Sequence, residues 1–474
     1  MTDKEFRLEH DSIGEMEVEK NAYYGVHSRR AHENFPITGV NTDREIIRGV
    51  AEIKKACAIT NFEVGMMDEK IKDAISHAAD KVAKGDFDEY FIVDPIQGGA
   101  GTSHNMNANE VIANVAIEEL GGELGDYSMV HPNDHINFGQ STNDVYPTSG
   151  KLAIIRYIEI LKEELEKLIK SLDKKAEEFD GIIKMGRTQM QDAIPIRLGQ
   201  EFAAYSQVLK RDLKRLDEAK KTVSVVNLGA TAIGTGLNAD ADYVKKVVPN
   251  LAKVTGLDLT QSENLVDGTQ NLDGFVYVSG ILKTLAVSLS KISNDFRIMS
   301  SGPRTGFGEI NLPAKQAGSS IMPGKVNPVI PEVVSQVAFS VIGNDMTIAM
   351  AAEGGQLELN AFEPVIFYKI FESFRTLKGA MYTLRVNCVD GIEANERHME
   401  ELVENSVGVI TAIVPHVGYE NAAKIAKEAI STGKPVRDLA IESGIISEED
   451  LNKILDPISM TEPGISAEEL LTDK

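Results

Sequence analysis

The sequence is poor in cysteine, in basic residues and in long apolar runs, and each shortage argues against a class of protein. Its 474 residues include two cysteines, Cys57 and Cys388, which are too few and too far apart for a disulfide framework or a cysteine metal site. The net charge of −23 disfavours nucleic acid and anionic membranes as partners, because both attract basic surfaces. No stretch approaches the roughly 18 apolar residues of a membrane span. We therefore expect a cytoplasmic protein.

Nucleotide-binding loops and a secretion signal are also missing. The run GSSIMPGKVNP at residues 318–328 resembles a phosphate-binding loop, but five residues separate its two glycines where that motif has four. Val326 also follows the lysine, where a magnesium-binding Ser or Thr is required. The first residues, MTDKEFRLEHD, are charged, so we expect no secretory signal. The glycine-rich run is therefore expected to hold some other anion.

Long stretches with helical periodicity dominate what the sequence does contain. Apolar residues recur every three or four positions in four runs, which are Leu152, Ile155, Ile158, Leu161, Leu165, Leu168 and Leu172; Phe202, Tyr205, Leu209, Leu213 and Leu216; Ile281, Leu285, Leu289, Ile292, Phe296 and Met299; and Ile366, Ile370, Phe374, Leu377, Met381 and Leu384. Each run predicts a long amphipathic helix. Residues 333–342 carry few charges on any face, and a helix of that kind must be buried on most sides. We predict a mainly α protein whose long helical bundle packs against copies of itself, with a thick single-chain core as the alternative.

The two ends of the chain differ from this central part. Alternating apolar residues between Phe6 and Val18 predict a small hairpin. Near the other end, Ser447-Glu-Glu-Asp450 resembles the capping box of a short helix. We predict three domains, which are a mixed, mostly helical N-terminal domain (1–140), a central long-helix bundle (141–395) and a small C-terminal helical domain (396–474).

Four stretches of small polar residues interrupt the helical pattern. They are QGGAGTSHNMN (97–107), HPNDHINFGQSTND (131–144), GRTQMQD (186–192) and GSSIMPGKVNP (318–328). Taken singly, each reads as a turn or a cap; Ser141 or Thr142, for example, would cap a helix that begins near Asp144. His131 and His135 have the spacing of a zinc helix, but no third ligand accompanies them, so no metal site is expected. Together the stretches offer hydroxyls, amides and one lysine, an inventory that suits a small substrate with several carboxylate oxygens.

The same four stretches resemble the signature regions of the fumarase/aspartase superfamily, lyases that eliminate ammonia, water or an amine from succinyl compounds to give fumarate. The resemblance runs from DSIGEMEVEKNAYYGVHSRRAHENF to GKPVRDLAIESG, nearly the whole chain. GGAGTSHNMNANEVIAN, QSTND with Thr142 and GRTQMQDA with Gln189 are typical of the aspartate ammonia-lyase branch. The class II fumarases are the alternative. His104 departs from the pattern, because a small residue is usual at its position.

The resemblance implies reversible elimination of ammonia from L-aspartate, by abstraction of the Cβ proton and formation of an enediolate-like intermediate. Such an intermediate places a second charge on a carboxylate and requires donors fixed in advance. The general base would be Ser319, on a mobile loop, with His135 as a fallback. The implied substrate-binding residues are Thr102, Ser141, Thr142 and Ser320 for the side-chain carboxylate, Lys325, Asn327 and Thr188 for the α-carboxylate, and Asn143 and Gln189 for the amine. A homotetramer with sites shared between subunits and no required cofactor is also implied.

Overall fold

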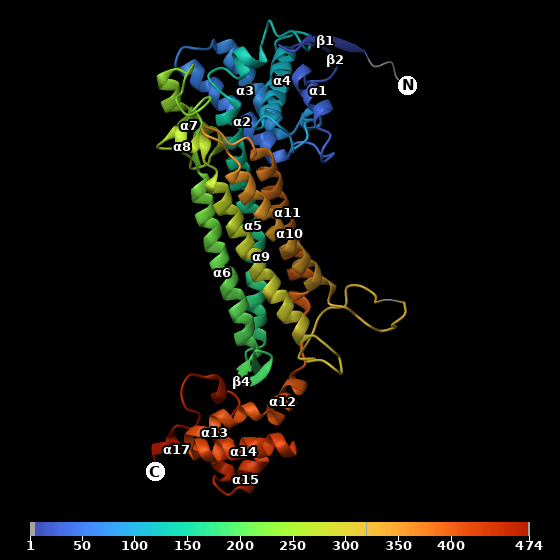
Figure 1. Cartoon of the computed structure of the whole chain (residues 1–474), viewed down its shortest axis with the longest axis vertical. Helices are drawn as coiled ribbons and strands as arrows, with labels where there is room; N and C mark the ends of the chain where they lie inside the picture. The colour runs from blue at the N-terminus through green and yellow to red at the C-terminus, as the bar shows by residue number, and fades with distance from the viewer. Residues whose placement is uncertain (1–4, 319, 473–474) are drawn as a thin grey trace. The chain divides into compact units, whose positions relative to one another are not determined.

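The computed structural model describes residues 5–318 and 320–472, which form mainly helices (Figure 1). Four small two-stranded sheets accompany the helices in the described part of the chain. They are β1 (Phe6–His10) with β2 (Glu15–Glu19), β3 (Ile183–Thr188) with β4 (Gln191–Arg197), β5 (Val225–Val226) with β6 (Thr260–Gln261), and β7 (Ile310–Asn311) with β8 (Glu393–Ala394). The β5–β6 pair is parallel and the other three are antiparallel. The predicted mainly α class is confirmed.

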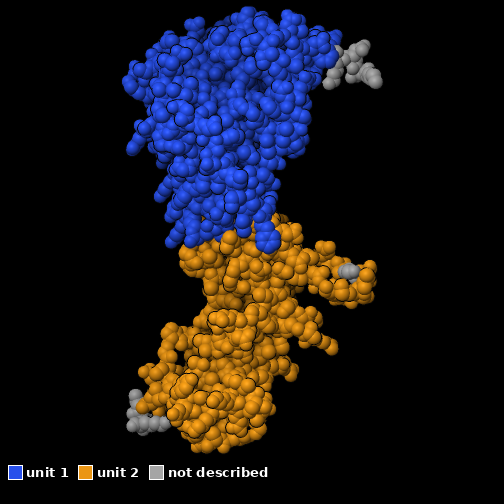
Figure 2. Space-filling model, viewed as in Figure 1, with its two compact units in different colours: residues 1–162, 214–284, 339–377 blue, residues 163–213, 285–338, 378–474 orange. Residues whose placement is uncertain are grey.

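The chain divides into two compact units (Figure 2). Unit 1 comprises residues 1–162, 214–284 and 339–377, and unit 2 comprises residues 163–213, 285–338 and 378–474. Five long helices contribute residues to both units: α5 (Thr142–Glu178), α6 (Leu198–Val223), α9 (Asp273–Met299), α10 (Val329–Glu353) and α11 (Glu363–Asn387). These long helices carry the four apolar runs found in the sequence.

The remaining helices are shorter and belong to one unit each. Unit 1 contains α1 (Val26–Asn34), α2 (Arg44–Glu63), α3 (Glu69–Lys84), η1 (Asp88–Tyr90), α4 (Thr102–Glu119), η2 (Pro132–Ile136), α7 (Ala241–Thr255) and α8 (Leu265–Gln270). Unit 2 contains η3 (Val389–Gly391), α12 (Glu396–Asn405), η4 (Val407–Val409), α13 (Ile410–Val417), α14 (Tyr419–Thr432), α15 (Val436–Glu442), α16 (Glu448–Ile454), η5 (Ser459–Thr461) and α17 (Glu469–Thr472). The turn η2 is a π-helix, and the other η elements are 3₁₀-helices.

Apolar periodicity predicted the long helices correctly. Every predicted core position of α5 from Leu152 to Leu172, and of α11 from Ile366 to Leu384, is at most 1% exposed. Burying a large aliphatic side chain stabilises a fold by about 1.5–3 kcal/mol. Each of these runs is therefore a continuous stripe of core, as the three-to-four-residue spacing predicted.

Polar side chains also join neighbouring helices. In unit 1, Lys283 of α9 forms an ion pair with Asp345 of α10 at 2.5 Å. In unit 2, Arg385 of α11 pairs with the largely buried Glu164 of α5 at 2.9 Å. Partly buried pairs of this kind lose less to solvent screening than exposed pairs, and they fix which helices are neighbours.

Two of the long helices, α9 and α10, are long and apolar enough to cross a membrane by length and composition alone. This is weak evidence, because core helices of globular proteins pass the same test. Lys283 and Asp345, paired between the two helices, would have to be desolvated in a bilayer. The sequence analysis expected no stretch near the length of an apolar membrane span. Judged by length and composition, α9 and α10 do not meet that expectation.

The smaller features predicted at the two ends of the chain are also present. Phe6 pairs with Glu19 in the antiparallel β1–β2 hairpin. At the start of α16, the backbone N–H of Asp450 donates to Ser447 Oγ at 3.0 Å, which is the predicted cap. Short-range sequence signals therefore located both elements.

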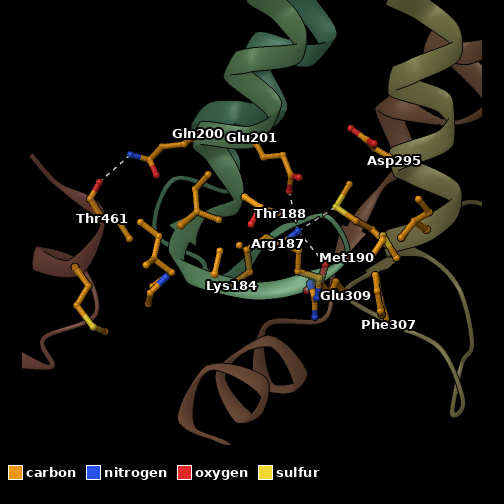
Figure 3. A pocket seen from close by; sticks show the side chains of 18 of the residues that line it. Lys184, Arg187, Thr188, Met190, Gln200, Glu201, Asp295, Phe307, Glu309 and Thr461 are labelled. Atoms are coloured by element: carbon orange, nitrogen blue, oxygen red, sulfur yellow. Dashed lines mark hydrogen bonds and ion pairs between the residues drawn. The ribbon is translucent and has the colours of Figure 1, made fainter. Parts of the chain in front are cut away.

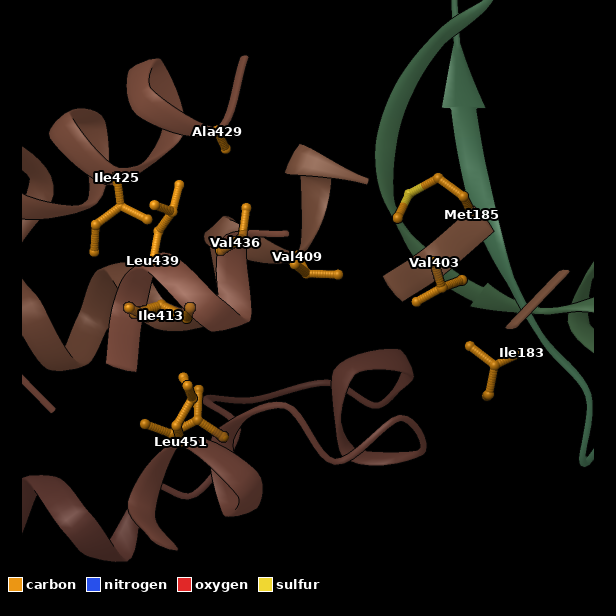
Figure 4. Packing of buried hydrophobic residues seen from close by; sticks show 12 residues of the cluster. Ile183, Met185, Val403, Val409, Ile413, Ile425, Ala429, Val436, Leu439 and Leu451 are labelled. Atoms are coloured by element: carbon orange, nitrogen blue, oxygen red, sulfur yellow. The ribbon is translucent and has the colours of Figure 1, made fainter. Parts of the chain in front are cut away.

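In unit 2 the C-terminal helices form an apolar core with the β3–β4 hairpin (Figure 4). Ile183 and Met185 of β3 belong to the same buried cluster as Val403 of α12 and Ile413 of α13. A Cβ atom at Gly408 would lie 2.3 Å from the carbonyl oxygen of Ala193 on β4, so the backbones approach closely there. The hairpin is thereby anchored to the C-terminal helices.

The two cysteines are both free and buried. Cys57 lies on α2 in unit 1, and Cys388 follows α11 in unit 2. Burial raises the pKa of each thiol to about 12. Both side chains therefore remain protonated and unreactive in the folded protein.

Candidate active site

A tight glycine turn precedes α4 in unit 1. Gly99, Ala100 and Gly101 have φ angles of 89°, 56° and 89°, which place three consecutive residues in the left-handed region. A Cβ atom at Gly101 would lie 2.2 Å from the ring of Tyr146 on α5, so only glycine allows this approach. The turn exposes Thr102 at the first position of α4, where Thr102 Oγ1 donates to the carbonyl of Gly99 at 2.7 Å. The starts of α4 and α5 are thus held together.

The start of α5 holds three of the predicted substrate-binding residues. Ser141 Oγ accepts from the backbone N–H of Asn143 at 3.3 Å, and the N–H of Ser141 donates to Asp144 Oδ1 at 3.0 Å. This reciprocal pair is a capping box and confirms the predicted cap. Thr142 Oγ1 accepts from Asn105 Nδ2 at 3.2 Å. Both hydroxyls accept from within the protein, so each can direct its own proton outward to an anion.

A buried lysine donates hydrogen bonds behind this region. Lys54 on α2 is fully buried, and its Nζ donates to Asn137 Oδ1 at 2.8 Å and to Gln140 Oε1 at 2.9 Å. Asn105 Nδ2 also donates to Asn137 Oδ1, at 3.1 Å, which connects the lysine to the amide that holds Thr142. Burial lowers the pKa of Lys54 to about 7. The sequence interpretation missed Lys54, although a lysine between Ile53 and Cys57 on a buried helix face was a usable signal.

Like Lys54, Asp144 was not predicted to have a role in the site; the sequence analysis named it only as the position near which a helix begins. Its side chain is buried, and Oδ2 accepts from the backbone N–H groups of Gly229 and Thr231 at 3.1 and 3.0 Å. Burial raises its pKa to about 6, while these backbone donors oppose the shift. The Ser-x-x-Asp spacing from Ser141 could have identified it.

The unusual His104 points into the interior rather than toward solvent. Only 4% of it is exposed, its ring stacks on Tyr146 with centroids 5.3 Å apart, and its Nδ1 lies 3.1 Å from the Tyr146 hydroxyl. Burial lowers its pKa to about 3, so the imidazole is neutral. His104 also lines a cavity of about 280 Å³ with Phe367 and Phe371. Thr102, two residues earlier, is by contrast exposed.

In unit 2, Thr188 ends β3 and Gln189 begins the turn to β4. Gln189 and Met190 have φ angles of 54° and 64°, the double left-handed conformation of a tight hairpin turn. Thr188 and Met190 line a cavity of about 740 Å³ (Figure 3). The turn therefore presents Thr188 and Gln189 at its exposed tip.

A buried carboxylate braces this hairpin from below, as Figure 3 shows. Glu309 is fully buried and pairs with Arg187 at 2.6 Å and with Lys184 at 2.9 Å, both from β3. The guanidinium of Arg187 also lies 4.2 Å from the ring centroid of Phe307. Nothing in the sequence patterns singled out Glu309, because its partners are more than a hundred residues away.

The glycine-rich run forms a pinched loop before α10. A Cβ atom at Gly318 would lie 1.9 Å from the carbonyl oxygen of Lys325, so the two ends of the loop touch. Ser320 and Lys325 are exposed and Asn327 is half-buried. The predicted base, Ser319, lies outside the described residues.

The predicted residues thus gather in three places. Unit 1 brings together Thr102 and the start of α5, while unit 2 carries the hairpin turn and the pinched loop separately. His131 Nδ1 accepts from the backbone N–H groups of Asn133 and Asp134 at 3.2 and 3.1 Å, so it caps its own turn. Within residues 5–318 and 320–472, no group of three His, Cys, Asp or Glu side chains could hold a metal ion.

Comparisons with known proteins agree over nearly the whole chain. Residues 14–343 match the lyase family, and residues 409–462 match the fumarase C C-terminus family; neither is a cofactor-binding family. The aspartate ammonia-lyase of Bacillus subtilis (strain 168) is 53% identical over 468 residues, which cover 99% of this chain and 98% of the relative.

Solved structures give the same result. A fumarate lyase:delta crystallin from Brucella melitensis bound to cobalt has a TM-score of 0.95 at 49% identity, covering 97% of this chain and 100% of that one. A class II fumarase from Schistosoma mansoni has a TM-score of 0.93 at 34% identity, with the same coverage. The chain therefore belongs to the fumarase/aspartase superfamily of lyases, together with the aspartate ammonia-lyases that match it over nearly their full length.

Proposed function

We propose that this protein catalyses the reversible elimination of ammonia from L-aspartate to give fumarate. The observation that carries the proposal is the start of α5, where the hydroxyls of Ser141 and Thr142 accept from within and can donate outward. Such donors suit a carboxylate whose charge grows during the reaction. The full-length similarity to aspartate ammonia-lyases supports the same reaction.

The reaction begins with removal of the Cβ proton next to the side-chain carboxylate. In the proposal the deprotonated side-chain oxygen of Ser319 takes this proton and becomes a hydroxyl, and Thr102, Ser141, Thr142 and Ser320 hold the carboxylate that gains charge. The N-termini of α4 and α5 add their partial positive charges. Thr102 must then release the Gly99 carbonyl, to which it now donates. The developing dianion thus meets donors that are largely fixed in advance.

The other predicted residues bind the rest of the substrate. Lys325, Asn327 and Thr188 bind the α-carboxylate in this proposal, and Asn143 and Gln189 contact the amine. Lys325 is exposed, and its charge offsets locally the net −23 of the chain. Once the proton has left, the carbon–nitrogen bond breaks and the nitrogen departs as ammonia.

We further propose that the protein is a homotetramer whose active sites combine residues of different subunits. The support is a stripe of exposed apolar residues along α10, consisting of Phe339 (65% exposed), Ile342 (41%), Met346 (64%) and Met350 (68%). Their spacing of three and four residues places them on one helix face. A contiguous apolar face of this kind marks an interaction surface. We also propose a cytoplasmic location and no requirement for an organic cofactor.

The decisive experiment is incubation of the purified protein with L-aspartate while fumarate is followed by its absorbance and ammonia is measured separately. Equal amounts of the two products are expected. L-Malate serves as the competing substrate. Fumarate from malate but not from aspartate would identify a class II fumarase and overturn the proposal.

A further inference from the structure

The segment of residues 227–232, here called the docking segment, lies against the start of α5 in unit 1. Asp144 is the main connection, because its two oxygens serve different parts of the chain. Oδ1 accepts from the N–H of Ser141 at 3.0 Å, and Oδ2 accepts from the N–H groups of Gly229 and Thr231 at 3.1 and 3.0 Å. One buried carboxylate therefore fixes the docking segment relative to the helix start.

Asn143 is held by the same segment from two sides. Its backbone carbonyl accepts from Asn227 Nδ2 at 3.0 Å, and its own Nδ2 donates to the carbonyl of Ala232 at 2.7 Å. The amide of Asn227 is itself fixed, because it also donates to Thr269 Oγ1 at 3.0 Å. Both the backbone and the side chain of Asn143 are thus positioned by residues 227–232.

The docking segment has little freedom to move. Gly229 and Thr231 have left-handed φ angles of 95° and 57°, and such a conformation is unfavourable for a β-branched residue such as threonine. Immediately after the segment, a Cβ atom at Gly234 would lie 2.3 Å from the Cα of Val266. The backbone is therefore packed tightly against α8 and holds its carbonyl groups in place.

This arrangement determines which end of the Asn143 amide is available. A backbone carbonyl can only accept, so the amide nitrogen of Asn143 must face Ala232 and its oxygen is left for other partners. An ammonium group is donor only and pairs with that oxygen. We propose that the docking segment is a positioning element that orients Asn143 as an acceptor and thereby sets the affinity for the amine. The inference rests on the proposed function, and it names Asn143, oriented by the docking segment, as the group that controls the affinity of the site for its nitrogen substrate.

The test measures the reverse reaction, because it separates the two reactants. Asn227→Ala removes the bond to the Asn143 carbonyl, and we expect the KM for ammonia to rise by about tenfold or more while the KM for fumarate stays within about twofold. Asn271→Ala is the matched control, since Asn271 is an exposed asparagine nearby in the chain whose amide donates to Asp267 and not to Asn143. The control should keep both KM values.

A second variant covers the case in which Asn227→Ala does not fold. Asn227→Asp keeps the shape of the side chain and removes the N–H group that donates to the Asn143 carbonyl, and the same selective rise in the ammonia KM is expected. Equal changes in both KM values, or a change in kcat alone, would overturn the inference. A wild-type protein that adds no ammonia to fumarate would instead overturn the proposed function, so the two failures are distinguishable.

Discussion

The proposed role of an individual side chain in this protein depends on the groups with which it forms hydrogen bonds. The hydroxyl of Ser141 accepts a hydrogen bond from the backbone N–H of Asn143, and the hydroxyl of Thr142 accepts one from the side chain of Asn105. Each hydroxyl proton is therefore available for another partner. The sequence predicted their importance from a resemblance, and it predicted the cap from a local pattern. It did not predict Asn105, because the bond from Asn105 to Asn137 depends on the fold, and it missed Lys54, whose place on a buried helix face was the available signal.

The proposed base can be tested at this scale. Ser319→Ala removes the hydroxyl that would take the Cβ proton, and kcat should fall by several orders of magnitude, roughly 10³-fold or more, with the fold intact. Steady-state kinetics measure the fall in kcat, and circular dichroism checks that the fold is intact. Ser431→Ala on α14 is the control, since Ser431 is an exposed hydroxyl. Near-normal turnover in Ser319→Ala would refute the assignment.

Lys325→Ala tests the proposed binding of the α-carboxylate. The variant loses a charged hydrogen-bond donor, so the KM for L-aspartate should rise by about 10- to 100-fold, with a smaller effect on kcat. Substrate titrations at constant ionic strength measure both constants. An unchanged KM would show that another group holds this carboxylate.

The neutral His104 predicts how stability depends on pH. Its folded pKa of about 3 lies below the ordinary value of 6.5, so unfolding takes up a proton in acid. The stabilisation is complete above pH 6.5 and declines by at most about 1.4 kcal/mol per pH unit as the pH falls toward 3. Denaturant titrations at several pH values should give a flatter dependence for His104→Ala. His77→Ala, at an exposed position, should follow the wild type.

At the scale of elements, the sequence was most informative where a pattern repeats. The runs in α5 and α11 repeat the helical period several times, and every predicted core position in them is buried. The β3–β4 hairpin gave a weaker signal, because its turn uses Gln189 and Met190 in a conformation usually occupied by glycine or asparagine. The contacts between Gly408 and β4 hold the hairpin, and these depend on residues that are distant in the chain.

Glu309 provides a test of how that hairpin is held. Glu309→Gln leaves the partly buried Arg187 without its carboxylate and the buried Lys184 with Glu201 alone, so the free energy of unfolding should fall by about 3 kcal/mol. Chemical denaturation measures the loss. The pair of the exposed Glu462 with Arg197 offers the control, and Glu462→Gln should change stability by about 1 kcal/mol or less. Equal effects of the two variants would contradict a bracing role.

For the whole molecule, the unpartnered stripe on α10 is the main feature. The sequence indicated it before the structure did, because residues 333–342 have few charges on any face. What the sequence could not give is which face stays exposed in the single chain. That depends on how the neighbouring helices cover Val341 and Ile348, each 1% exposed, while Phe339 remains 65% exposed.

The exposed apolar stripe on α10 predicts that a single charge introduced into it will weaken subunit association. Met346→Glu places a carboxylate in the proposed subunit interface, and we expect a smaller species in sedimentation and loss of activity with it. Ile430→Glu is the control, since Ile430 is 73% exposed and belongs to a different helix, α14. A variant at Met346 that keeps the wild-type sedimentation coefficient and full turnover would show that this face is not an interface.

The buried thiols of Cys57 and Cys388 can report local opening of the folded protein. Because the intact fold shields both sulfur atoms, a maleimide or an iodoacetamide dye can attach only after the surrounding helices have opened. The rate of labelling would then report the opening of α2 and of the chain after α11 separately, once each adduct is located by mass spectrometry. The protein can in this way be followed under storage or heating without an engineered probe.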